Sequence, residues 1–289
     1  MNTEDLLAGA STGDGFDLAD ARRVITTALA EDLRYGADAT TEATVPADAV
    51  AVAELTPRAA GVLAGIPVAL EVFRQVTDVE VLERRRDGDK AVPGEPALVL
   101  RGPVRGLLTA ERTALNLLCH LSGVATLTAA WVDEVAGTKA RVRDSRKTLP
   151  GLRLLEKYAV RCGGGVNHRL GLGDAVLIKD NHVRAAGSVR AALAAVRAHA
   201  PHLGCEVEVD SLDQLDEAVA EGAELVLLDN FTAADCAEAV RRAGGVRLEA
   251  SGGLTLDVAR AYAETGVDYL AVGGLTHSAP ALDLGLDLR

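Results

Sequence analysis

The stretch CEVEVDSLDQLDEAVAEGAELVLLDN, residues 205–230, contains one complete unit of a repeating pattern. An apolar run at Cys205–Val209 is followed by a helical stretch that opens at Ser211, a residue type that caps helix N-termini. A second apolar run, Leu225–Leu228, comes next and ends in Asp-Asn. A strand, a helix and a strand in this order are typical of a parallel βα unit.

The same alternation continues on both sides of this unit. The later apolar runs recur about every 21 residues, and Ser188, Thr232 and Thr255 stand where the intervening helices are expected to begin. The other runs are Ala140–Val142, Ala175–Ile178, Val246–Leu248 and Tyr269–Val272. Residues 140–275 are too few for a full (β/α)8 barrel, which takes roughly 200–250 residues. The pattern predicts an α/β protein with an incomplete α/β barrel of six or seven strands over residues 119–275.

The residues before this region follow a different pattern. Helices are expected at Asp17–Leu33 and Ile66–Val76, among short apolar runs separated by turn residues. The expected strands are Val50–Leu55, Gly61–Gly65, Val79–Leu82 and Ala97–Leu100. Strands beside segregated helices predict an N-terminal α+β, sandwich-like domain over residues 17–118, which residues 276–289 are expected to join.

Two further segments connect or precede these domains. Leu107–Leu118 and Leu121–Val135 are expected to form two apolar helices, with Gly123 early in the second permitting close packing. Residues 1–16 are small and polar, and are expected to form a flexible N-terminal arm.

Composition narrows the class of protein. Of the 289 residues, 48% are hydrophobic, which is enough for a large core and excludes a disordered chain. The net charge of −12 argues against general binding to nucleic acids or anionic membranes. The sequence contains no stretch approaching ~18 uncharged apolar residues and no export signal. The four cysteines are widely spaced, without a CxxC pair. A soluble cytoplasmic protein with buried, reduced thiols is predicted.

One segment of this acidic protein is basic. Residues 141–182 carry nine basic against four acidic side chains. Such a concentration of positive charge favours binding of a small anion. The alternative is a solvated helix face, which Arg153, Lys157 and Arg161 fit at spacings of four residues.

Polar residues stand at the carboxyl end of each predicted barrel strand, where parallel βα folds bind ligands. Arg146 and Lys147 follow the first strand and place a planar guanidinium group beside a compact ammonium group. This pair suits a carboxylate next to a phosphate. Lys179 ends the second strand, where burial would be costly without an anionic partner. His168 and Arg169 form a second polar patch, although His168 taken alone is equally consistent with a structural role.

The later strand ends add carboxylates and glycines. Glu208 and Asp229 could hold a divalent cation, directly or through water, or stabilise positive charge; pairing with nearby basic groups is the alternative. Ser251-Gly252-Gly253 and Gly273-Gly274 follow the last two strands, where barrels bind phosphate through backbone N–H groups. Because no known nucleophile motif, Walker loop or HExxH is present, we expect a site that positions anions and stabilises charge.

The same residues resemble, in order along the chain, those of quinolinate phosphoribosyltransferases. The matching segments are ERTALN (111–116), DSRKT (144–148), GGG (163–165) with NHR (167–169), LIKDNH (177–182), EVEVD (206–210), LDN (228–230), EASGG (249–253) and YLAVG (269–273). The resemblance implies a homodimeric pentosyltransferase of NAD biosynthesis that uses Mg²⁺. It implies transfer of phosphoribosyl from phosphoribosyl pyrophosphate to quinolinate with decarboxylation, giving nicotinate mononucleotide, pyrophosphate and CO₂.

The resemblance also implies how the substrates are held. Arg146, His168, Arg169 and Lys179 would bind the carboxylates of quinolinate, and Arg112 would reach that pocket from the partner subunit.

The phosphorylated substrate would have its own set of residues. Lys147 would face it, and Glu208 and Asp229 would lie near the ribose and the metal, so that these three and Lys179 are the expected catalytic groups. The other implied substrate-binding residues are Ser145 and, around the 5′-phosphate, Ser251, Gly252, Gly253, Val272, Gly273 and Gly274.

Two alternatives stay open. One is a phosphoribosyltransferase of the same fold that acts on a mono-acid or another heterocycle, such as a molybdenum-associated paralogue. Several cations aimed at the aromatic acid favour a di-acid over this. The other is a non-catalytic sensor of a phosphate ligand. The presence of Lys179, Glu208 and Asp229 argues against a sensor, since binding alone does not need groups at the ribose and the leaving group.

Overall fold

The computed structural model describes residues 16–289 and divides them into two compact units. Within the described chain, the first unit comprises residues 16–129, 148–164 and 275–289, and the second comprises 130–147 and 165–274. These units differ from the expected domain ranges, because residues 148–164 group with the first unit and not with the barrel. The expected arm, residues 1–16, lies outside the described residues except for Phe16.

The first unit is built on an antiparallel sheet in the order β12-β1-β5-β3. The strands are β1 (Val50–Pro57), β3 (Glu80–Arg84), β5 (Leu98–Pro103) and β12 (Leu284–Leu288), with β2 (Gly61–Val62) and β4 (Lys90–Ala91) forming a separate small sheet. Strand β12 comes from the C-terminal end of the chain and pairs with β1 from Ala53↔Leu288 to Pro57↔Leu284. Ala53 and Leu55 alternate with more exposed residues along β1 and are fully buried, as expected for a sheet covered on one face.

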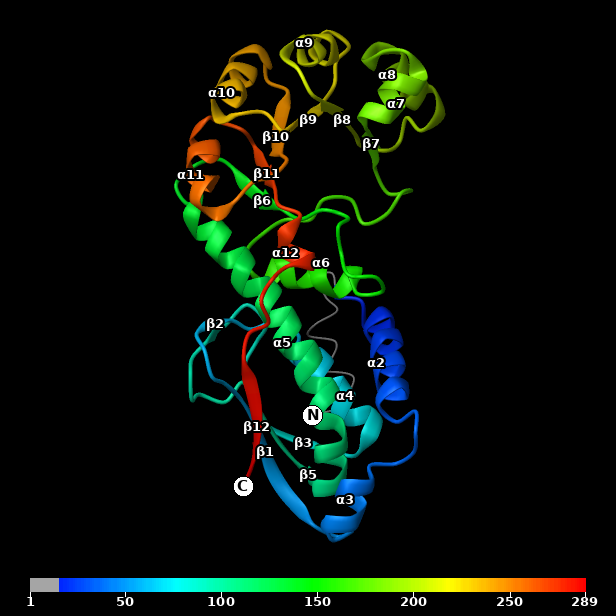
Figure 1. Cartoon of the computed structure of the whole chain (residues 1–289), viewed down its shortest axis with the longest axis vertical. Coiled ribbons are helices and arrows are strands. Elements are labelled where there is room, and N and C mark those ends of the chain that lie inside the picture. The colour runs from blue at the N-terminus through cyan, green and yellow to red at the C-terminus, as the bar shows by residue number, and fades with distance from the viewer. Residues whose placement is uncertain (1–15) are drawn as a thin grey trace. The chain divides into compact units, whose positions relative to one another are not determined.

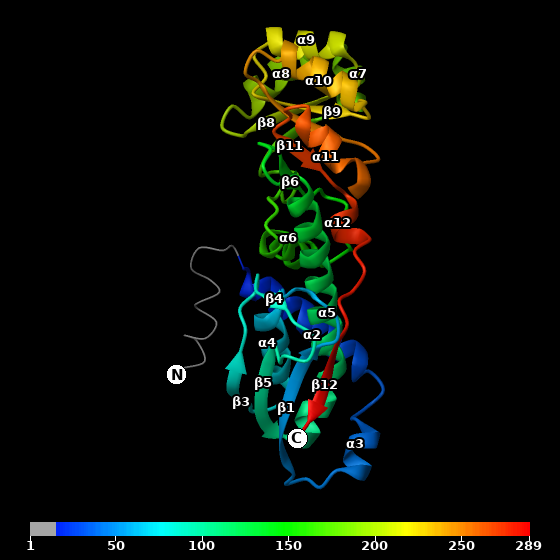
Figure 2. The same ribbon diagram turned by 90° about the vertical axis from the view of Figure 1, so that its left-hand side faces the viewer.

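Helices cover one face of this sheet, and Figure 2 shows α2, α4 and α5 behind its strands. The helices of this unit are α2 (Leu18–Asp32), α3 (Ala39–Thr44), α4 (Ile66–Val76), α5 (Val104–Glu134), which ends in the second unit, and α6 (Arg153–Cys162). The predicted helices at 17–33 and 66–76 are confirmed as α2 and α4. The carboxylate of Asp87 accepts hydrogen bonds from the N–H groups of Gly65 and Ile66, both at 2.9 Å, and so satisfies the N-terminus of α4.

Helix α5 is continuous, and the prediction of two helices between residues 107 and 135 is wrong. Gly123 does not begin a new helix; a Cβ atom there would lie 2.2 Å from the carbonyl oxygen of Pro280, so glycine lets the C-terminal chain pass against an unbroken helix. His120, the polar residue beside the expected break, is bonded to Glu156 Oε1 at 2.9 Å. The helix is long and apolar enough to cross a membrane, but 56% of its most apolar window is buried, so α5 is a core helix of the protein.

Helix α6 corrects a second expectation. A solvated face formed by Arg153, Lys157 and Arg161 was the alternative explanation of the basic segment, but Lys157 is 0% exposed. Spacing of charges along a helix therefore does not indicate here which face meets solvent.

The second unit is a six-stranded parallel sheet in the order β6-β11-β10-β9-β8-β7, with β6 and β7 as its edges. Its strands are β6 (Arg141–Arg143), β7 (Val176–Ile178), β8 (Cys205–Val209), β9 (Leu225–Asp229), β10 (Arg247–Ser251) and β11 (Tyr269–Ala271). Its helices are α7 (Asp180–Ala186), α8 (Val189–His199), α9 (Leu212–Ala220), α10 (Ala233–Arg242) and α11 (Leu256–Glu264), and the short α12 (Gly274–His277) follows. Figure 1 shows α8 to α11 on the outer side of these strands. The predicted incomplete α/β architecture is confirmed, with six strands.

The caps expected from the sequence explain where these helices begin. Ser188 Oγ accepts from the N–H of Ala191 at 3.1 Å, and Thr232 forms a reciprocal capping box with Asp235. Ser211 and Thr255 occupy the N-cap positions of α9 and α11, without a side-chain hydrogen bond to the helix. Helices α9, α10 and α11 therefore start within a few residues of a strand end, whereas α8 follows α7, and the loops between strand and helix carry polar residues of the site.

The cysteines are free thiols, as expected, but only Cys236 is fully buried. Burial raises the pKa of Cys236 to about 12, so its thiol is protonated and unreactive at neutral pH.

Candidate active site

A pocket of about 410 Å³ opens at the carboxyl ends of the parallel strands, and all six strands or the loops that follow them contribute to it. Its lining residues are Asp144, Ser145, Arg146, Lys147, His168, Arg169, Leu177, Lys179, Glu208, Leu227, Asp229, Glu249, Ser251, Gly252, Ala271 and Gly273. The apolar members come from within the strands and the polar ones mostly from their ends. The pocket thus combines an apolar floor with a polar rim, as small-molecule sites commonly do.

Two guanidinium groups dominate the basic side of this pocket. Arg146 Nε and Arg169 Nε are both buried, and in the described part of the chain neither has a hydrogen-bond partner. Burial, and then the positive charge of Arg146, lowers the pKa of Arg169. Two positive groups that each bury an N–H donor without an acceptor destabilise the folded protein unless an anion binds to them. The planar guanidinium of arginine matches the geometry of a carboxylate. This side of the pocket is suited to an acid with more than one negative charge.

The loop that carries Arg169 is fixed by a buried carboxylate. Asp144 is fully buried; its Oδ2 accepts from Asn167 Nδ2 at 2.6 Å and its Oδ1 from the backbone N–H of His168 at 2.8 Å. His168 Nδ1 in turn accepts the N–H of Arg169 at 2.7 Å. A ring nitrogen that accepts carries no proton, so His168 Nε2 is the protonated nitrogen and donates to Glu206 Oε2 at 2.7 Å. Both ring nitrogens of His168 therefore have protein partners in this structure.

A second buried acid lies beside this histidine. Glu249 is fully buried and accepts from Arg143 Nη1 at 2.5 Å, while the Oε1 atoms of Glu206 and Glu249 are buried without a partner among the described residues. Burial, followed by the negative charge of Glu206, raises the pKa of Glu249 to about 8, although Arg143 acts in the opposite direction. Glu249 is therefore predominantly protonated at neutral pH.

Three of these groups have the composition of a metal site. Candidate ligand atoms of His168, Glu206 and Glu249 all lie within 4.8 Å of one another. However, His168 uses both nitrogens for protein partners, and Arg143 already supplies positive charge to Glu249. We therefore assign this cluster to the support of the pocket and not to a metal.

The two lysines of the pocket lie on its exposed side. Lys179 is 48% exposed, and its Nζ donates to Glu208 Oε2 at 3.0 Å. Strand β7 ends at Ile178, so Lys179 is not buried in the sheet, and it has the anionic partner that the sequence suggested it would need. The pairing of Glu208 with a basic group, which the sequence left open, is observed. Lys147 is also exposed, and its N–H donates to Ser145 Oγ at 3.0 Å.

Glu208 and Asp229 are the carboxylates that could hold a divalent cation. They stand at the ends of adjacent parallel strands, β8 and β9, and both line the pocket. Their present partners are single donors, Lys179 Nζ for Glu208 and Asn230 Nδ2, at 2.8 Å, for Asp229. Carboxylate oxygens are the ligands Mg²⁺ prefers, and it commonly takes one or two of them together with substrate phosphates and water. The donor set therefore fits Mg²⁺.

Two glycines let the rim of the pocket close tightly. Gly252 has φ +96°, and a Cβ there would lie 2.2 Å from Asn230 Oδ1. A Cβ on Gly273 would lie 2.9 Å from Cδ of Lys147. Glycine at 252 thus lets the loop after β10 approach the loop after β9, and glycine at 273 leaves room for the Lys147 side chain from the loop after β6.

Most of the residues predicted from the sequence meet in this pocket. Those brought together are Ser145, Arg146, Lys147, His168, Arg169, Lys179, Glu208, Asp229, Ser251, Gly252 and Gly273. Four predicted residues do not line it: Arg112, Gly253, Val272 and Gly274. Arg112 is exposed on α5.

Sequence reasoning gave no role to three buried acids, Asp144, Glu206 and Glu249. The available signal was weak: each is a charged residue directly after or inside an apolar strand run.

Comparison with known proteins gives consistent matches. Family models described as the N-terminal and C-terminal domains of quinolinate phosphoribosyl transferase match residues 38–122 and 124–287. The nicotinate-nucleotide pyrophosphorylase (carboxylating) of Mycobacterium leprae is 62% identical over 93% of this chain and 97% of its own length. A probable enzyme of the same name from Bacillus subtilis is 41% identical over 82% of this chain and 83% of its own. The structure of the nicotinate-nucleotide pyrophosphorylase from Francisella tularensis is 40% identical and superposes with a TM-score of 0.91, covering 95% of this chain and 98% of that one.

Proposed function

The chain belongs to the quinolinate phosphoribosyltransferase family, its activity is that of a carboxylating nicotinate-nucleotide pyrophosphorylase in NAD biosynthesis, and we propose that the pocket at the six strand ends is its active site. Its substrates are accordingly quinolinate and phosphoribosyl pyrophosphate. Both are anions, which accounts for a basic segment in an acidic protein.

The observation that carries this proposal is the pair of guanidinium groups with buried, unused donors, Arg146 and Arg169. Quinolinate carries two adjacent carboxylates on a flat ring, and two forks side by side are complementary to such a di-acid. We assign both arginines, together with His168 and Lys179, to quinolinate. His168 contributes by accepting the backbone N–H of Arg169, which holds that arginine in place, and by lining the pocket itself.

Other residues that line the pocket suit the phosphorylated substrate. We assign Lys147 and Ser145 to its phosphates, and the backbone around Ser251-Gly252-Gly253 and Val272-Gly273-Gly274 to its 5′-phosphate. Glu208 and Asp229 are assigned to the ribose and Mg²⁺. The metal, when bound, neutralises charge on the pyrophosphate and so makes it a better leaving group.

The reaction needs alignment and electrostatic stabilisation more than acid–base catalysis. The lone pair of the pyridine nitrogen forms a bond to ribose C1, and the bond from C1 to pyrophosphate breaks with its electrons leaving on the pyrophosphate. Glu208 and Asp229 stabilise the positive charge that develops at C1. The ring nitrogen is then cationic and draws in the electrons released when the adjacent carboxylate leaves as CO₂, and the ring carbon takes up a proton. Arg146 and Arg169 hold the ring so that its nitrogen faces C1 throughout.

We further propose that the enzyme is a cytoplasmic homodimer whose partner subunit supplies Arg112. This residue does not line the pocket of its own chain but is exposed on α5, where it is available to a second copy. Arg112, as a fourth cation beside Arg146, Arg169 and Lys179, would favour quinolinate over mono-acids.

The direct test is substrate discrimination. With phosphoribosyl pyrophosphate and Mg²⁺, quinolinate should give nicotinate mononucleotide and one pyrophosphate per turnover, and nicotinate should be a far poorer substrate. Equal or better turnover of nicotinate, or of another heterocycle, would contradict the assignment of the two arginines to a di-acid. Binding of both substrates without turnover would favour a sensor.

A further inference from the structure

Asp144 is a fully buried charged residue that lines the pocket, and no step of the reaction described above uses it. We propose that Asp144 is a positioning residue that fixes the direction of the loop 167–169 and so aims Arg169 at the aromatic acid. This inference rests on the function proposed for the pocket, and it gives a role to a side chain placed directly before the basic pair Arg146 and Lys147.

Both oxygens of the carboxylate accept hydrogen bonds from the loop. Its Oδ2 accepts from the side chain of Asn167 at 2.6 Å and its Oδ1 from the backbone N–H of His168 at 2.8 Å. The distances are those of charge-assisted hydrogen bonds, which are stronger than neutral ones. One side chain therefore fixes both the backbone and a side chain of the segment that precedes Arg169.

The backbone completes this attachment. The N–H of Asp144 donates to the carbonyl of Val166 at 3.2 Å, and the N–H of Val166 donates to the carbonyl of Val142 at 2.9 Å, so that the loop begins as a short parallel extension beside β6. At the other end, the ring of His168 accepts the N–H of Arg169. The path from Asp144 to the Arg169 backbone is thus a continuous set of hydrogen bonds, with Glu206 fixing the far nitrogen of the ring.

Positioning and charge predict opposite effects for this residue. A buried negative charge in the same pocket as two guanidinium groups reduces the positive potential that attracts an acid. If only charge mattered, Asp144→Asn would bind a di-acid more tightly. If the carboxylate positions the loop, Asp144→Asn should bind it more weakly, because both charge-assisted hydrogen bonds are lost and the Asn167 amide must turn over to accept from the new N–H₂.

The reciprocal exchange separates the two explanations. In Asp144→Asn/Asn167→Asp, the amide at 144 can donate to the carboxylate at 167 and still accept from the N–H of His168. The exchange restores both hydrogen bonds and the net charge. Asn167→Asp alone should be the worst variant, since it places two carboxylates against each other.

The experiment uses the full-length enzyme and measures two quantities. Binding of phthalate, which has the two adjacent carboxylates but no ring nitrogen to react, is measured by calorimetry. The KM values for quinolinate and for phosphoribosyl pyrophosphate are measured separately. For Asp144→Asn we expect phthalate affinity and quinolinate KM to worsen roughly tenfold, as for the loss of charge-assisted hydrogen bonds. The KM for phosphoribosyl pyrophosphate should stay within about twofold, and the reciprocal exchange should recover most of the loss.

Controls keep the outcome decisive. Asp235→Asn removes an exposed carboxylate that caps α10 away from the pocket, and should change neither KM. If Asp144→Asn does not fold, Asn167→Ala, which removes only one of the two bonds, carries the test with an expected loss of a few-fold. Phthalate affinity that is unchanged or higher in a folded variant, or a folded exchange variant that recovers nothing, would overturn the positioning role. If the unaltered enzyme neither binds phthalate nor converts quinolinate, the proposed function itself fails.

Discussion

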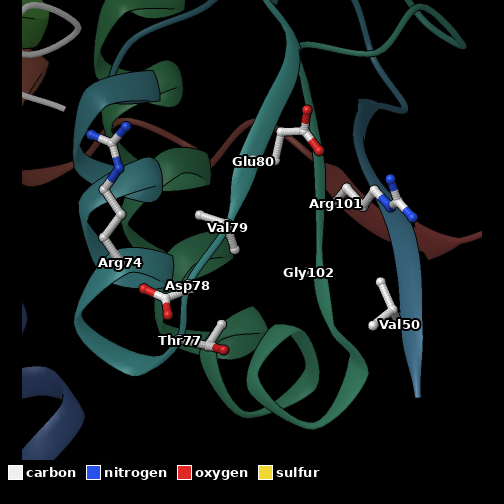
Figure 3. Close-up of a pocket in the computed structure, with 8 residues that line it drawn as sticks. All are labelled: Val50, Arg74, Thr77, Asp78, Val79, Glu80, Arg101 and Gly102. Atoms are coloured by element: carbon white, nitrogen blue, oxygen red, sulfur yellow. The ribbon is translucent and has the colours of Figure 1, made fainter. Parts of the chain in front are cut away.

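The two compact units each carry a hollow, and the larger hollow is not the one that has the features of an active site. One hollow of the first unit has a volume of about 510 Å³, against about 410 Å³ for the pocket at the strand ends. Figure 3 shows its lining residues, which are Val50, Arg74, Thr77, Asp78, Val79, Glu80, Arg101 and Gly102. Volume alone therefore does not identify a site in this protein.

The difference lies in how the charged groups are arranged. In the first hollow two basic and two acidic residues are mixed, and Glu80 and Arg101 are direct partners on neighbouring strands. Arg74 has a buried Nη1 without a partner among the described residues, as the pocket arginines have, but Arg74 and Arg101 lie on opposite sides of the hollow in Figure 3. A parallel sheet, in contrast, brings its strand ends to one edge, so its cations converge. The strand-end pocket also contains acidic residues, but two of its guanidinium groups, those of Arg146 and Arg169, lie close enough to affect each other, and this pair distinguishes the active site.

The largest expected effect tests whether the first unit contributes to the site through a second copy. Arg112→Ala and Lys179→Ala enzymes should each lose nearly all activity, since each lacks a cation at the acid. Mixing them under conditions of subunit exchange should restore part of the activity, because some heterodimers carry one complete site. Activity that does not return, although exchange is demonstrated by differently labelled subunits, would contradict a shared site.

A smaller but sharper test compares one arginine from each hollow. Arg146→Ala should lower kcat/KM for quinolinate by roughly 30-fold or more, equivalent to at least about 2 kcal/mol of transition-state stabilisation, because a charge-assisted contact is lost. Arg101→Ala, which removes an exposed arginine of the first hollow, should leave kcat/KM unchanged. Similar losses for the two variants would remove the distinction between the hollows.

The buried acids of the two units give a pH-dependent comparison. Asp87 in the first unit accepts three hydrogen bonds, from Gly65, Ile66 and Tyr158. Glu249 accepts one, from Arg143, and its Oε1 lies 4.0 Å from His168 Nε2 without a hydrogen bond among the described residues. Burial raises the pKa of both acids, that of Glu249 to about 8. Because the pKa is higher in the folded state, the folded state binds more protons than the unfolded state. The resulting contribution to the free energy of unfolding is present at low pH and is lost as pH rises through about 8.

Glu249→Gln should remove the contribution of Glu249 to the pH dependence of the free energy of unfolding. Between pH 5.5 and 8.5 the free energy of unfolding of the unaltered enzyme should fall by on the order of 2 kcal/mol more than that of the variant. Urea unfolding at the two pH values measures this difference, and Asp87 contributes equally in both proteins. Parallel pH profiles would show that Glu249 is ionised in the folded state.

The smallest expected effect is the difference between substituting Gly252, which lies at the active site, and Gly94, which lies in a turn of the first unit. Gly252→Ala and Gly94→Ala both place a side chain at positive φ, which costs roughly 1–2 kcal/mol. Only at Gly252 would the new Cβ also meet another loop, at Asn230. Gly252→Ala should therefore lose about 1 kcal/mol more stability, and only this variant should raise the KM for phosphoribosyl pyrophosphate. Equal KM values in both variants would exclude the Gly252 loop from phosphate binding.

The sequence predicts local elements well, because their signals are local. The runs at Cys205–Val209 and Leu225–Leu228 are strands, and Ser188 and Thr232 cap helices as their residue types suggest. Errors arise where a distant segment decides the outcome. Gly123 suggests a break in a helix until the chain at Pro280 is known to pass beside it.

The same limit applies to the active site. The polar residues at the strand ends are identifiable because βα topology brings such ends together, and most of them do line the pocket. The buried network of Asp144, Glu206 and Glu249 was missed, because whether a carboxylate is paired depends on residues far away in the sequence, such as Arg143 for Glu249. Arg112 illustrates the remaining case, a residue whose predicted role requires a second chain.

The most direct test of this account measures release of CO₂ from quinolinate labelled in the carboxyl group adjacent to the ring nitrogen. Release should require phosphoribosyl pyrophosphate and Mg²⁺ together, should match pyrophosphate formation one to one, and should be nearly abolished in Arg146→Ala but not in Arg101→Ala. Folded enzyme that binds phosphoribosyl pyrophosphate but releases no CO₂, or that releases it equally well without Arg146, would contradict the claim that the converging arginines at the strand ends hold the di-acid for reaction.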